Sequence, residues 1–456
     1  MEPLGDGDGP GLREGNLQAP TRHPVDWRNP EFFDADALQK EEQRVFDICH
    51  GCRRCVSLCG AFPTLFDLVD ESATMEVDGV AKADYWKVVD QCYLCDVCYM
   101  TKCPYVPPHP WNVDFPHLML RAKAQRFRDR PVPTRDRLLT STDAVGKLAT
   151  IPVVVHAVNK ANKLPVVRKV MQGLLGVAQD AWLPPYASTR FRSDVVPSLQ
   201  WPVRNGARTP GKVAIFATCY VNYNEPSIGH DLVKLLGHAE VPYVVVESEV
   251  CCGMPKLEIG DLEGVEALKV QNVPPLAALA RAGYALVTPV PSCTLMFKHE
   301  LALLYPDDDD VAAIADAMFD PFEYFVARER DGLLQKSFTR ALGHVSYHIP
   351  CHSRVQNMGQ KTRELLERIP DTTVNTVERC AGHDGTWGVK VEYFAESMRI
   401  GKPVFARMAD GDPDFISSDC PIAGRRIQQG IERQGGGTRA RKEHPLTLLR
   451  MAYGLD

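Results

Sequence analysis

The stretch VPYVVVESEVCCG, residues 241–253, decides the fold of the C-terminal half of the chain. Its β-branched run predicts a buried strand, and two adjacent cysteines and a glycine follow where that strand ends. Short apolar runs that end in cysteine also occur in KVAIFATC (212–219) and YALVTPVPSC (284–293), with helical stretches between them. Strands that alternate with helices indicate parallel pairing in a doubly wound sheet.

The same arrangement recurs in HVSYHIPC (344–351), TTVNTVERCAG (372–382) and DFISSDC (414–420), which predicts an internal duplication. Ligands of open α/β sheets gather outside the carboxyl ends of the strands. We therefore expect two α/β domains, each of which brings cysteines from three strands to one metal centre. The first set is Cys219, Cys251, Cys252 and Cys293, and the second is Cys351, Cys380 and Cys420.

The two sets differ at one position, because Ala381 stands where the first repeat has Cys252. In the first set, Gly253 lets a turn direct both adjacent thiols toward the metal. In the second set, three thiolates leave one iron open to another ligand, and the nearby candidates are His352, His383 and Asp384. The alternative is a decayed repeat in which three buried cysteines only pack. Both interpretations stay open.

Two further cysteine runs, CHGCRRCVSLCG (49–60) and CYLCDVCYMTKCP (92–104), predict two [4Fe-4S] clusters and hence electron transfer. The last cysteine of each run ligates the other cluster in two-cluster ferredoxins. We assign Cys49, Cys52, Cys55 and Cys103 to one cluster, and Cys92, Cys95, Cys98 and Cys59 to the other. Gly60 follows Cys59 where such motifs usually have a proline. Four residues separate Cys98 from Cys103, where three are usual. A zinc ribbon rarely packs three cysteines into seven residues, so it is the weaker alternative.

Composition restricts the functional classes further. The chain has 456 residues, which suggests about three domains. A net charge of -6 argues against a nucleic-acid surface. The 15 cysteines are too few for a secreted disulfide scaffold, and metal ligands must stay reduced, so we expect a cytoplasmic protein. The sequence predicts neither a signal peptide nor a membrane-spanning helix.

The expected organisation has five parts. They are a disordered tail (1–30), a helical ferredoxin-like domain (31–130), a linker (131–210) and two α/β domains (211–335 and 336–456), with helices at 32–48 and 115–128. The linker is rich in proline and contains LATIPVVVHAVN (148–159) and an apolar stretch at 164–177. These stretches are interpreted either as amphipathic segments in a membrane interface or as a linker packed across the next domain.

The motifs resemble those of CCG-domain Fe-S oxidoreductases. The resemblance rests on CYVNYNEPSIGHDLVKLL (219–236), CCGMP (251–255), PSCTLMF (291–297), YHIPCH (347–352), CAGHDGTWGVK (380–390) and EHPLTLL (443–449). This group includes the iron-sulfur subunit of anaerobic glycerol-3-phosphate dehydrogenase, glycolate and lactate oxidase iron-sulfur subunits, and heterodisulfide reductase subunits. The resemblance implies a further cluster on Cys219, Cys251, Cys252 and Cys293. VPSC (290–293) lacks a second cysteine and CAG replaces the second CCG, which argues against disulfide reduction.

Three functions follow as hypotheses. The first is an electron-transfer subunit of an oxidoreductase complex, which passes electrons from a flavoprotein or other donor through two [4Fe-4S] clusters to a CCG-bound cluster and on to quinone or another acceptor. No G-x-G-x-x-G follows a predicted strand, so hydride chemistry belongs to the partner protein. The second is an Fe-S reductase that acts on a disulfide or supplies a rubrerythrin-like diiron protein. The third is a protein whose CCG repeats are partly structural and serve docking. Membrane association is peripheral at most, on the inner face of the cytoplasmic membrane.

Overall fold

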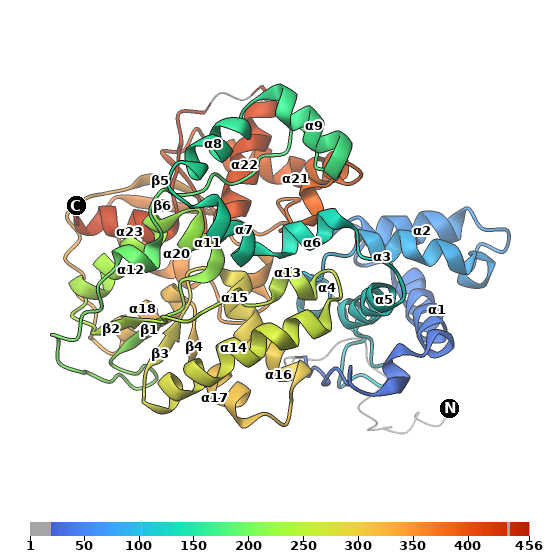
Figure 1. Ribbon diagram of the computed structural model, residues 1–456, viewed down its shortest axis with the longest axis horizontal. Coiled ribbons are helices and arrows are strands. Elements are labelled where there is room, and N and C mark those ends of the chain that lie inside the picture. The colour runs from blue at the N-terminus through green and yellow to red at the C-terminus, as the bar shows by residue number, and fades with distance from the viewer. Residues whose placement is uncertain (1–19, 102, 436–437, 456) are drawn as a thin grey trace, which may run out of the picture. The chain divides into compact units, whose positions relative to one another are not determined.

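The computed structural model describes residues 20–101, 103–435 and 438–455, and the chain divides into two compact units (Figure 1). Unit 1 extends to Arg128, and unit 2 comprises Asp129–Asp456. Of the expected tail 1–30, residues 1–19 lie outside the described residues. Residues 20–30 differ from the expected tail, because they are folded into unit 1 with Val25 and Trp27 buried.

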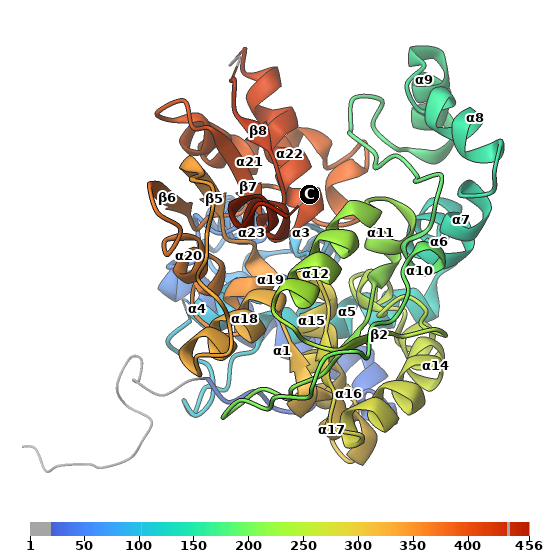
Figure 2. The same cartoon turned by 90° about the vertical axis from the view of Figure 1, so that its left-hand side faces the viewer.

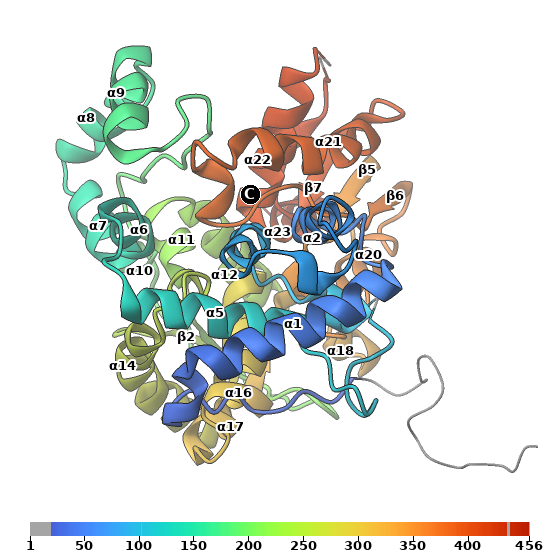
Figure 3. The same cartoon turned by 90° about the vertical axis from the view of Figure 1, so that its right-hand side faces the viewer.

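The described part of unit 1 contains helices and no strand. Its α-helices are α1 (Ala35–Cys52), α2 (Ala61–Asp70), α3 (Tyr85–Gln91), α4 (Val97–Thr101) and α5 (Phe115–Asp129). The helices expected at 32–48 and 115–128 correspond to α1 and α5. The core is aromatic: the ring of Phe115 lies 4.7 Å from that of Phe62 and 6.1 Å from that of Phe46. These contacts join α1, α2 and α5, and Figure 3 shows α1 and α5 side by side.

Arg22 fastens the segment before α1 to the second cysteine run. Its guanidinium lies 2.9 Å from Asp96 and 2.8 Å from Asp114, and 4.8 Å from the centre of the Tyr99 ring. Its two carboxylate partners are largely buried, which makes these ion pairs stronger than surface ones. Residues 20–22 therefore belong to the folded unit.

Unit 2 contains two four-stranded sheets with the same strand order. The first sheet has the order β2-β1-β3-β4 and the second β6-β5-β7-β8, and all pairings are parallel. The strands are β1 (Val213–Ile215), β2 (Tyr243–Val245), β3 (Ala285–Val287), β4 (Met318–Phe319), β5 (Gly343–His348), β6 (Thr372–Val377), β7 (Phe415–Ser418) and β8 (Arg441–Lys442). Figure 2 shows the second sheet. The two expected α/β domains with parallel sheets are present.

Helices cover both sheets of unit 2. In the first repeat they are α11 (Thr218–Tyr223), α12 (Pro226–His238), α13 (Met254–Leu257), α14 (Leu262–Arg281), α15 (Pro291–Leu295), α16 (Leu301–Leu304), α17 (Asp309–Ala317) and α18 (Pro321–Arg330). In the second they are α19 (Cys351–Arg354), α20 (Lys361–Leu366), α21 (Phe394–Ala409), α22 (Pro421–Arg433) and α23 (Pro445–Tyr453). Strands β1 and β3 are buried throughout, as parallel strands between helical layers require.

The segment expected to be a linker, 131–210, is part of unit 2. It contains α6 (Thr134–Thr140), α7 (Thr142–Ala149), α8 (Val154–Ala161), α9 (Pro165–Leu175) and α10 (Phe191–Asp194). Helix α6 is tied to the second repeat, because Arg135 lies 2.6 Å from Glu392 and Asp136 lies 2.9 Å from Lys390. This part of the segment therefore packs across the α/β repeats.

Helices α8 and α9 stand at the margin of unit 2 (Figures 2 and 3). Helix α9 carries an exposed apolar stripe. Val166, Val170 and Leu174 recur at four-residue spacing on α9 and are 74%, 51% and 80% exposed. This is the arrangement that the membrane-interface interpretation requires. In the described ranges, no helix combines the length and the apolar character that a membrane crossing needs.

Glu42 gives unit 1 a predictable pH dependence. This glutamate is buried in α1, and burial raises its pKa from 4.5 to about 7 against the opposing charges of Arg121 and Lys82. The carboxyl group loses its proton at a lower pH in the unfolded chain than in the folded one. The free energy of unfolding therefore falls as the pH rises from about 4.5 to about 7. We expect Glu42→Gln to raise the stability of unit 1 by about 2 kcal/mol at pH 8 and by less at pH 5.5.

Thermal unfolding followed by circular dichroism at pH 5.5, 7 and 8 measures this difference. Glu41→Gln, at the partly exposed neighbouring position, is the control. A stability gain that is equal at all three pH values would contradict the assignment of the effect to Glu42 ionisation.

Candidate functional site

The cysteine runs of unit 1 contain three non-glycine residues in the left-handed region. Arg53, Leu94 and Asp96 have φ values of 53°, 52° and 59°, and each lies between or next to cysteines. Such values are uncommon outside glycine. These conformations turn the chain sharply within each run. The turns let two cysteines with two residues between them point toward the same place.

The structure gathers the eight thiols of unit 1 into two groups. Burial raises the pKa of Cys49 well above 9.0, and the neighbouring thiols of Cys103, Cys55 and Cys52 raise it further. Burial likewise raises the pKa of Cys98, followed by the effects of its neighbours Cys95, Cys55, Cys92 and Cys59. Each group joins one run to the last cysteine of the other run, and Cys55 lies near both. Ligation of iron by these groups stays a prediction.

Polar groups that stabilise thiolate surround the sulfur atoms of unit 1. Burial raises the pKa of Cys92 to about 12, and the ammonium group of Lys123 and the N–H of Leu94 oppose that rise. Lys123 is itself buried and donates to the backbone carbonyl of Cys92. Burial raises the pKa of Cys103 to about 11, against hydrogen bonds from the N–H groups of Tyr105 and Val106. Amide donors and a buried cation are what an anionic Fe-S cluster requires around its sulfur ligands.

In the first repeat of unit 2, the four cysteines meet at the carboxyl ends of three strands. Cys219 lies in the first turn of α11, after β1; Cys251 and Cys252 follow β2; Cys293 lies in α15, after β3. The thiol of Cys251 is in hydrogen-bond contact with those of Cys219 and Cys252, and Cys252 also contacts Cys293. Because β1 lies between β2 and β3, the chain diverges at this edge, which is where α/β sheets bind ligands.

The thiols of Cys219, Cys251 and Cys252 differ in the direction of their pKa shifts. Hydrogen bonds from Cys219 and Cys252 lower the pKa of Cys251, while the same contacts and burial raise the pKa of both neighbours. The N–H of Gly253 also stabilises the Cys251 thiolate, and Thr142 lies close to it. Gly253 has a φ of 102°, which only glycine adopts readily, so the sharp turn after the cysteine pair requires it.

The four thiols are ligands of the chemical kind that an Fe-S cluster takes. Among residues 20–101, 103–435 and 438–455, no group of three or more His, Cys, Asp or Glu side chains has the geometry to hold one metal ion. A [4Fe-4S] cluster takes each thiolate on a different iron and does not need the tight coordination shell of one ion. The residues therefore fit a cluster by their number, their chemistry and their convergence.

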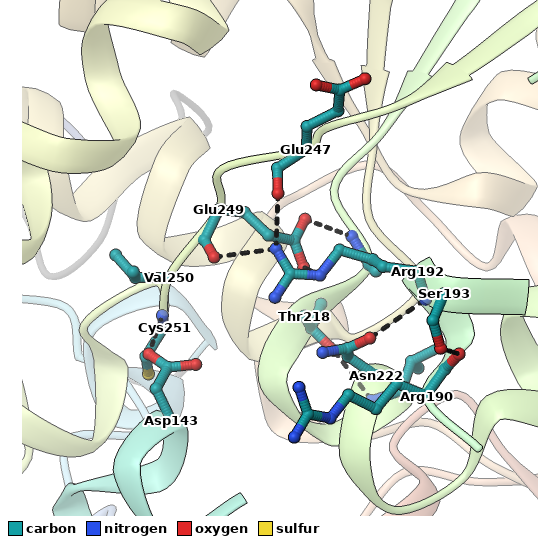
Figure 4. Close-up of polar contacts among 12 residues, drawn as sticks. Asp143, Arg190, Arg192, Ser193, Thr218, Asn222, Glu247, Glu249, Val250 and Cys251 are labelled. Atoms are coloured by element: carbon teal, nitrogen blue, oxygen red, sulfur yellow. Dashed lines mark hydrogen bonds and ion pairs between the residues drawn. The ribbon is translucent and has the colours of Figure 1, made fainter. Parts of the chain in front are cut away.

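Buried side chains hold the loop that carries the cysteine pair. Asn272 of α14 accepts the N–H of Val250 at 3.0 Å and donates to the carbonyls of Val250 and Cys251 at 3.2 and 3.0 Å. Asp143 of α7 accepts the N–H of Cys251 at 2.6 Å (Figure 4). Arg192 donates to the carbonyl of Glu249 at 3.0 Å. Backbone groups that have no partner in the sheet are thus satisfied by side chains.

The second repeat places its cysteines at the equivalent strand ends. Cys351 begins α19, Cys380 follows β6 and Cys420 precedes α22. The N–H of Gly382 donates to the sulfur of Cys380 at 3.3 Å. Burial raises the pKa of Cys420 to about 11, against hydrogen bonds from the first amides of α22. Ala381 is buried in an apolar cluster with Val377, Val404 and Phe405, so packing fills the position of the missing cysteine.

The histidines near the second set have different surroundings. His348 uses both ring nitrogens, one with Ser418 Oγ at 3.0 Å and the other with the carbonyl of Arg379 at 2.9 Å. His352 bonds through Nδ1 to Ser292 Oγ at 2.8 Å. Burial lowers the pKa of His383 to about 3, helped by Arg426, His352 and His348. Three residues are candidates for a fourth ligand beside the three cysteines of the second repeat. Asp384 and His352 are buried, and His383 is partly exposed.

The cysteine sites of the two repeats lie next to each other within unit 2. His352, adjacent to Cys351, bonds to Ser292, adjacent to Cys293. Tyr220, adjacent to Cys219, has its pKa raised by burial, by Glu225 and by Cys420 of the other repeat. Neighbouring residues of both cysteine sets therefore meet in one buried interface.

Sequence reasoning missed the residues that support the first site. Thr142, Asp143 and Arg192 come from the segment expected to be a linker, and only the fold brings them to Cys251. Glu249 and Asn272 carry weak signals: Glu249 is an acid in the short segment between an apolar strand and the cysteine pair, and Asn272 is a polar residue among the buried positions of a helix. Such residues point to buried hydrogen bonding, though not to a particular partner.

Loss of Asn272 is expected to open the cysteine loop. Asn272→Leu leaves one amide and two carbonyls of residues 250–251 without a partner, at a cost of about 3 kcal/mol in the free energy of local opening. Hydrogen exchange of peptides that cover residues 247–253 should therefore become about 100-fold faster. Gln271→Leu, at the exposed neighbouring position, should leave exchange of the loop unchanged. Equal exchange in both variants would show that Asn272 does not hold the loop.

Comparison with known proteins identifies the family. The model of the CCG cysteine-rich domain matches residues 213–298 and 345–422. One subunit of the anaerobic glycerol-3-phosphate dehydrogenase of Escherichia coli K12, the one designated C, is 28% identical over 352 residues, which cover 75% of this chain and 83% of that protein. Lactate utilization protein A is 29% identical over 254 residues in Bacillus pumilus, covering 54% of this chain and 99% of that protein. In Bacillus thuringiensis it is 31% identical over 234 residues, covering 49% and 93%. The resemblance expected from the motifs is confirmed, and the chain belongs to the family of proteins with the CCG cysteine-rich domain.

Proposed function

We propose that this protein is an iron-sulfur electron-transfer subunit of an oxidoreductase complex. The observation that carries the proposal is the meeting of four thiols, from Cys219, Cys251, Cys252 and Cys293, at the carboxyl edge of one parallel sheet. Buried thiols in mutual contact repel one another once they are deprotonated. An Fe-S core removes that repulsion, because each thiolate binds a different iron.

Two clusters in unit 1 complete the electron path. The two groups of thiols there combine both cysteine runs, as the crossed ligation of two-cluster ferredoxins requires. Such clusters accept and release single electrons. We propose that they connect an external donor to the cluster in the first CCG repeat.

The donor is proposed to be a flavoprotein subunit. A relative of this chain is named as a subunit of anaerobic glycerol-3-phosphate dehydrogenase, which is a multisubunit enzyme by that name. No dinucleotide-binding glycine motif follows a predicted strand of this chain, so the two-electron step belongs to the partner. Electrons would leave the CCG site for quinone or another acceptor.

The cytoplasmic side of the membrane suits this role. Thiolate clusters need a reducing compartment. The exposed apolar stripe Val166, Val170 and Leu174 of α9 has the exposed Lys163 and Lys169 beside it, a combination that favours peripheral attachment to an anionic surface.

Iron content tests the number of clusters. Protein purified without oxygen and reconstituted should hold about twelve iron atoms with a filled first repeat, or about sixteen if both repeats are filled. Iron and acid-labile sulfide analysis provides this count. About eight iron atoms would mean that both CCG repeats are empty and that their role is docking.

Substitutions separate the two repeats. Cys252→Ala gives the first repeat the residue that the second has at 381 and should remove about four iron atoms with the corresponding electron paramagnetic resonance signal. Cys380→Ala is the matched change in the second repeat. It should leave the iron count unchanged if Cys351, Cys380 and Cys420 only pack, and lower it if they hold a cluster. Retention of all iron in Cys252→Ala would contradict the first-repeat site.

A further inference from the structure

The chain makes a strained turn directly before Cys219. Strand β1 ends at Ile215, and the N–H of Phe216 makes a last bond to the carbonyl of Val287 at 3.0 Å. Thr218 then adopts a φ of 72° and is completely buried. A β-branched residue rarely takes this conformation, so the surrounding structure must enforce it.

The side chain of Glu249 occupies the inside of this turn (Figure 4). Its Oε2 accepts the N–H of Ala217 at 2.7 Å, and the nearby N–H of Thr218 also acts to lower the pKa of the carboxyl group. The carboxyl group thus lies beside two successive amides that have left the sheet. Because Glu249 lies two residues before Cys251, one side chain connects the segments that carry three of the four cysteines.

Arg192 keeps Glu249 in place. Its Nη1 donates to the carbonyls of Glu247 and Glu249 at 3.2 and 3.0 Å, and its Nε lies 3.9 Å from Glu249 Oε1. The backbone N–H of Arg192 donates to Asn222 Oδ1 of α11 at 3.1 Å. Arg192 therefore holds both the loop after β2 and the helix that starts with Cys219.

The second repeat supplies an internal comparison. With Cys351 matched to Cys219, Pro350 stands where Thr218 stands and has an ordinary φ of -69°. Glu378 matches Glu249, but its side chain is 43% exposed, compared with 3% for Glu249, and lies 3.8 Å from Arg354. The buried glutamate thus occurs together with the left-handed turn in the repeat that has four cysteines.

We propose that Glu249 is a positioning residue, whose carboxyl group fixes the left-handed turn at Thr218 and thereby the place of the Cys219 thiol relative to Cys251. Its relevance to a cluster rests on the proposed function. The positioning itself is a property of the metal-free chain and can be tested without iron.

Alkylation of thiols in the metal-free full-length protein provides this test, with the modification of Cys219 followed by mass spectrometry. Glu249→Ala removes the acceptor, so the turn opens more often and Cys219 should react at least about tenfold faster. Glu249→Gln keeps a side-chain oxygen and should stay within about threefold of the wild type. Glu378→Ala, the matched change in the second repeat, should leave the Cys219 rate unchanged. Wild-type rates in Glu249→Ala, or equal rates in the Ala and Gln variants, would overturn the proposal.

Glycine at position 218 gives a second, independent measurement. Glycine adopts a φ of 72° without strain, so the turn should no longer need the carboxyl group of Glu249 to hold it. In the Thr218→Gly background, Glu249→Ala should therefore accelerate alkylation by less than about threefold. An undiminished tenfold effect would mean that Glu249 acts through something other than this turn. The double variant also answers the question if Glu249→Ala alone does not fold.

The reconstituted protein then separates the two proposals. If the wild type holds a first-repeat cluster, Glu249→Ala should change its electron paramagnetic resonance line shape, and Glu249→Gln should preserve it. An unchanged line shape in the Ala variant overturns the positioning role while the cluster assignment stands. If the wild type holds no iron in this repeat, the proposed function fails, and the alkylation rates alone decide the role of Glu249.

Discussion

Cysteines from three separate strands can share one centre only if the loops after those strands are held without help from the sheet. Hydrogen bonds of the ladder end at β1, β2 and β3, yet the backbone beyond them is buried and needs partners. Asn272, Asp143, Arg192 and Glu249 supply these partners. The thiols themselves contribute little to this order, because protonated sulfur forms weak hydrogen bonds. The geometry of the cysteines therefore depends on side chains that carry no sulfur.

The two repeats have the same sheet topology and differ in their loops. In both sheets the first strand lies between the second and the third. In each repeat, the cysteines follow these three strands. Pro350 replaces the left-handed Thr218, Ala381 replaces Cys252, and Glu378 faces solvent where Glu249 is buried. These three differences affect one site together. The first repeat therefore combines four cysteines with the side chains that support them, and the second repeat has neither the fourth cysteine nor the buried glutamate.

The sequence predicts the strands of unit 2 well where an apolar run ends in cysteine, because burial and the metal-ligand pattern point to the same place. It does not predict β4 and β8, which have two residues each and carry no β-branched run. It also does not predict which residues of the segment 131–210 support the first cysteine site. Asp143 and Cys251 lie 108 residues apart, and a contact of that separation leaves no periodic pattern in either segment. Long-range hydrogen bonding to a loop is therefore visible only in the fold.

The interface between the repeats explains why two unequal sites stay together. Glu225, adjacent to the first site through Tyr220, lies 3.3 Å from Lys442 and 3.5 Å from Arg425 of the second repeat. Asp231 lies 2.6 Å from Arg450. Separation of the repeats would leave these largely buried charges without partners, which is costly even where a buried ion pair adds little net stability. The two cysteine sites are therefore held at a fixed separation by ion pairs that carry no sulfur.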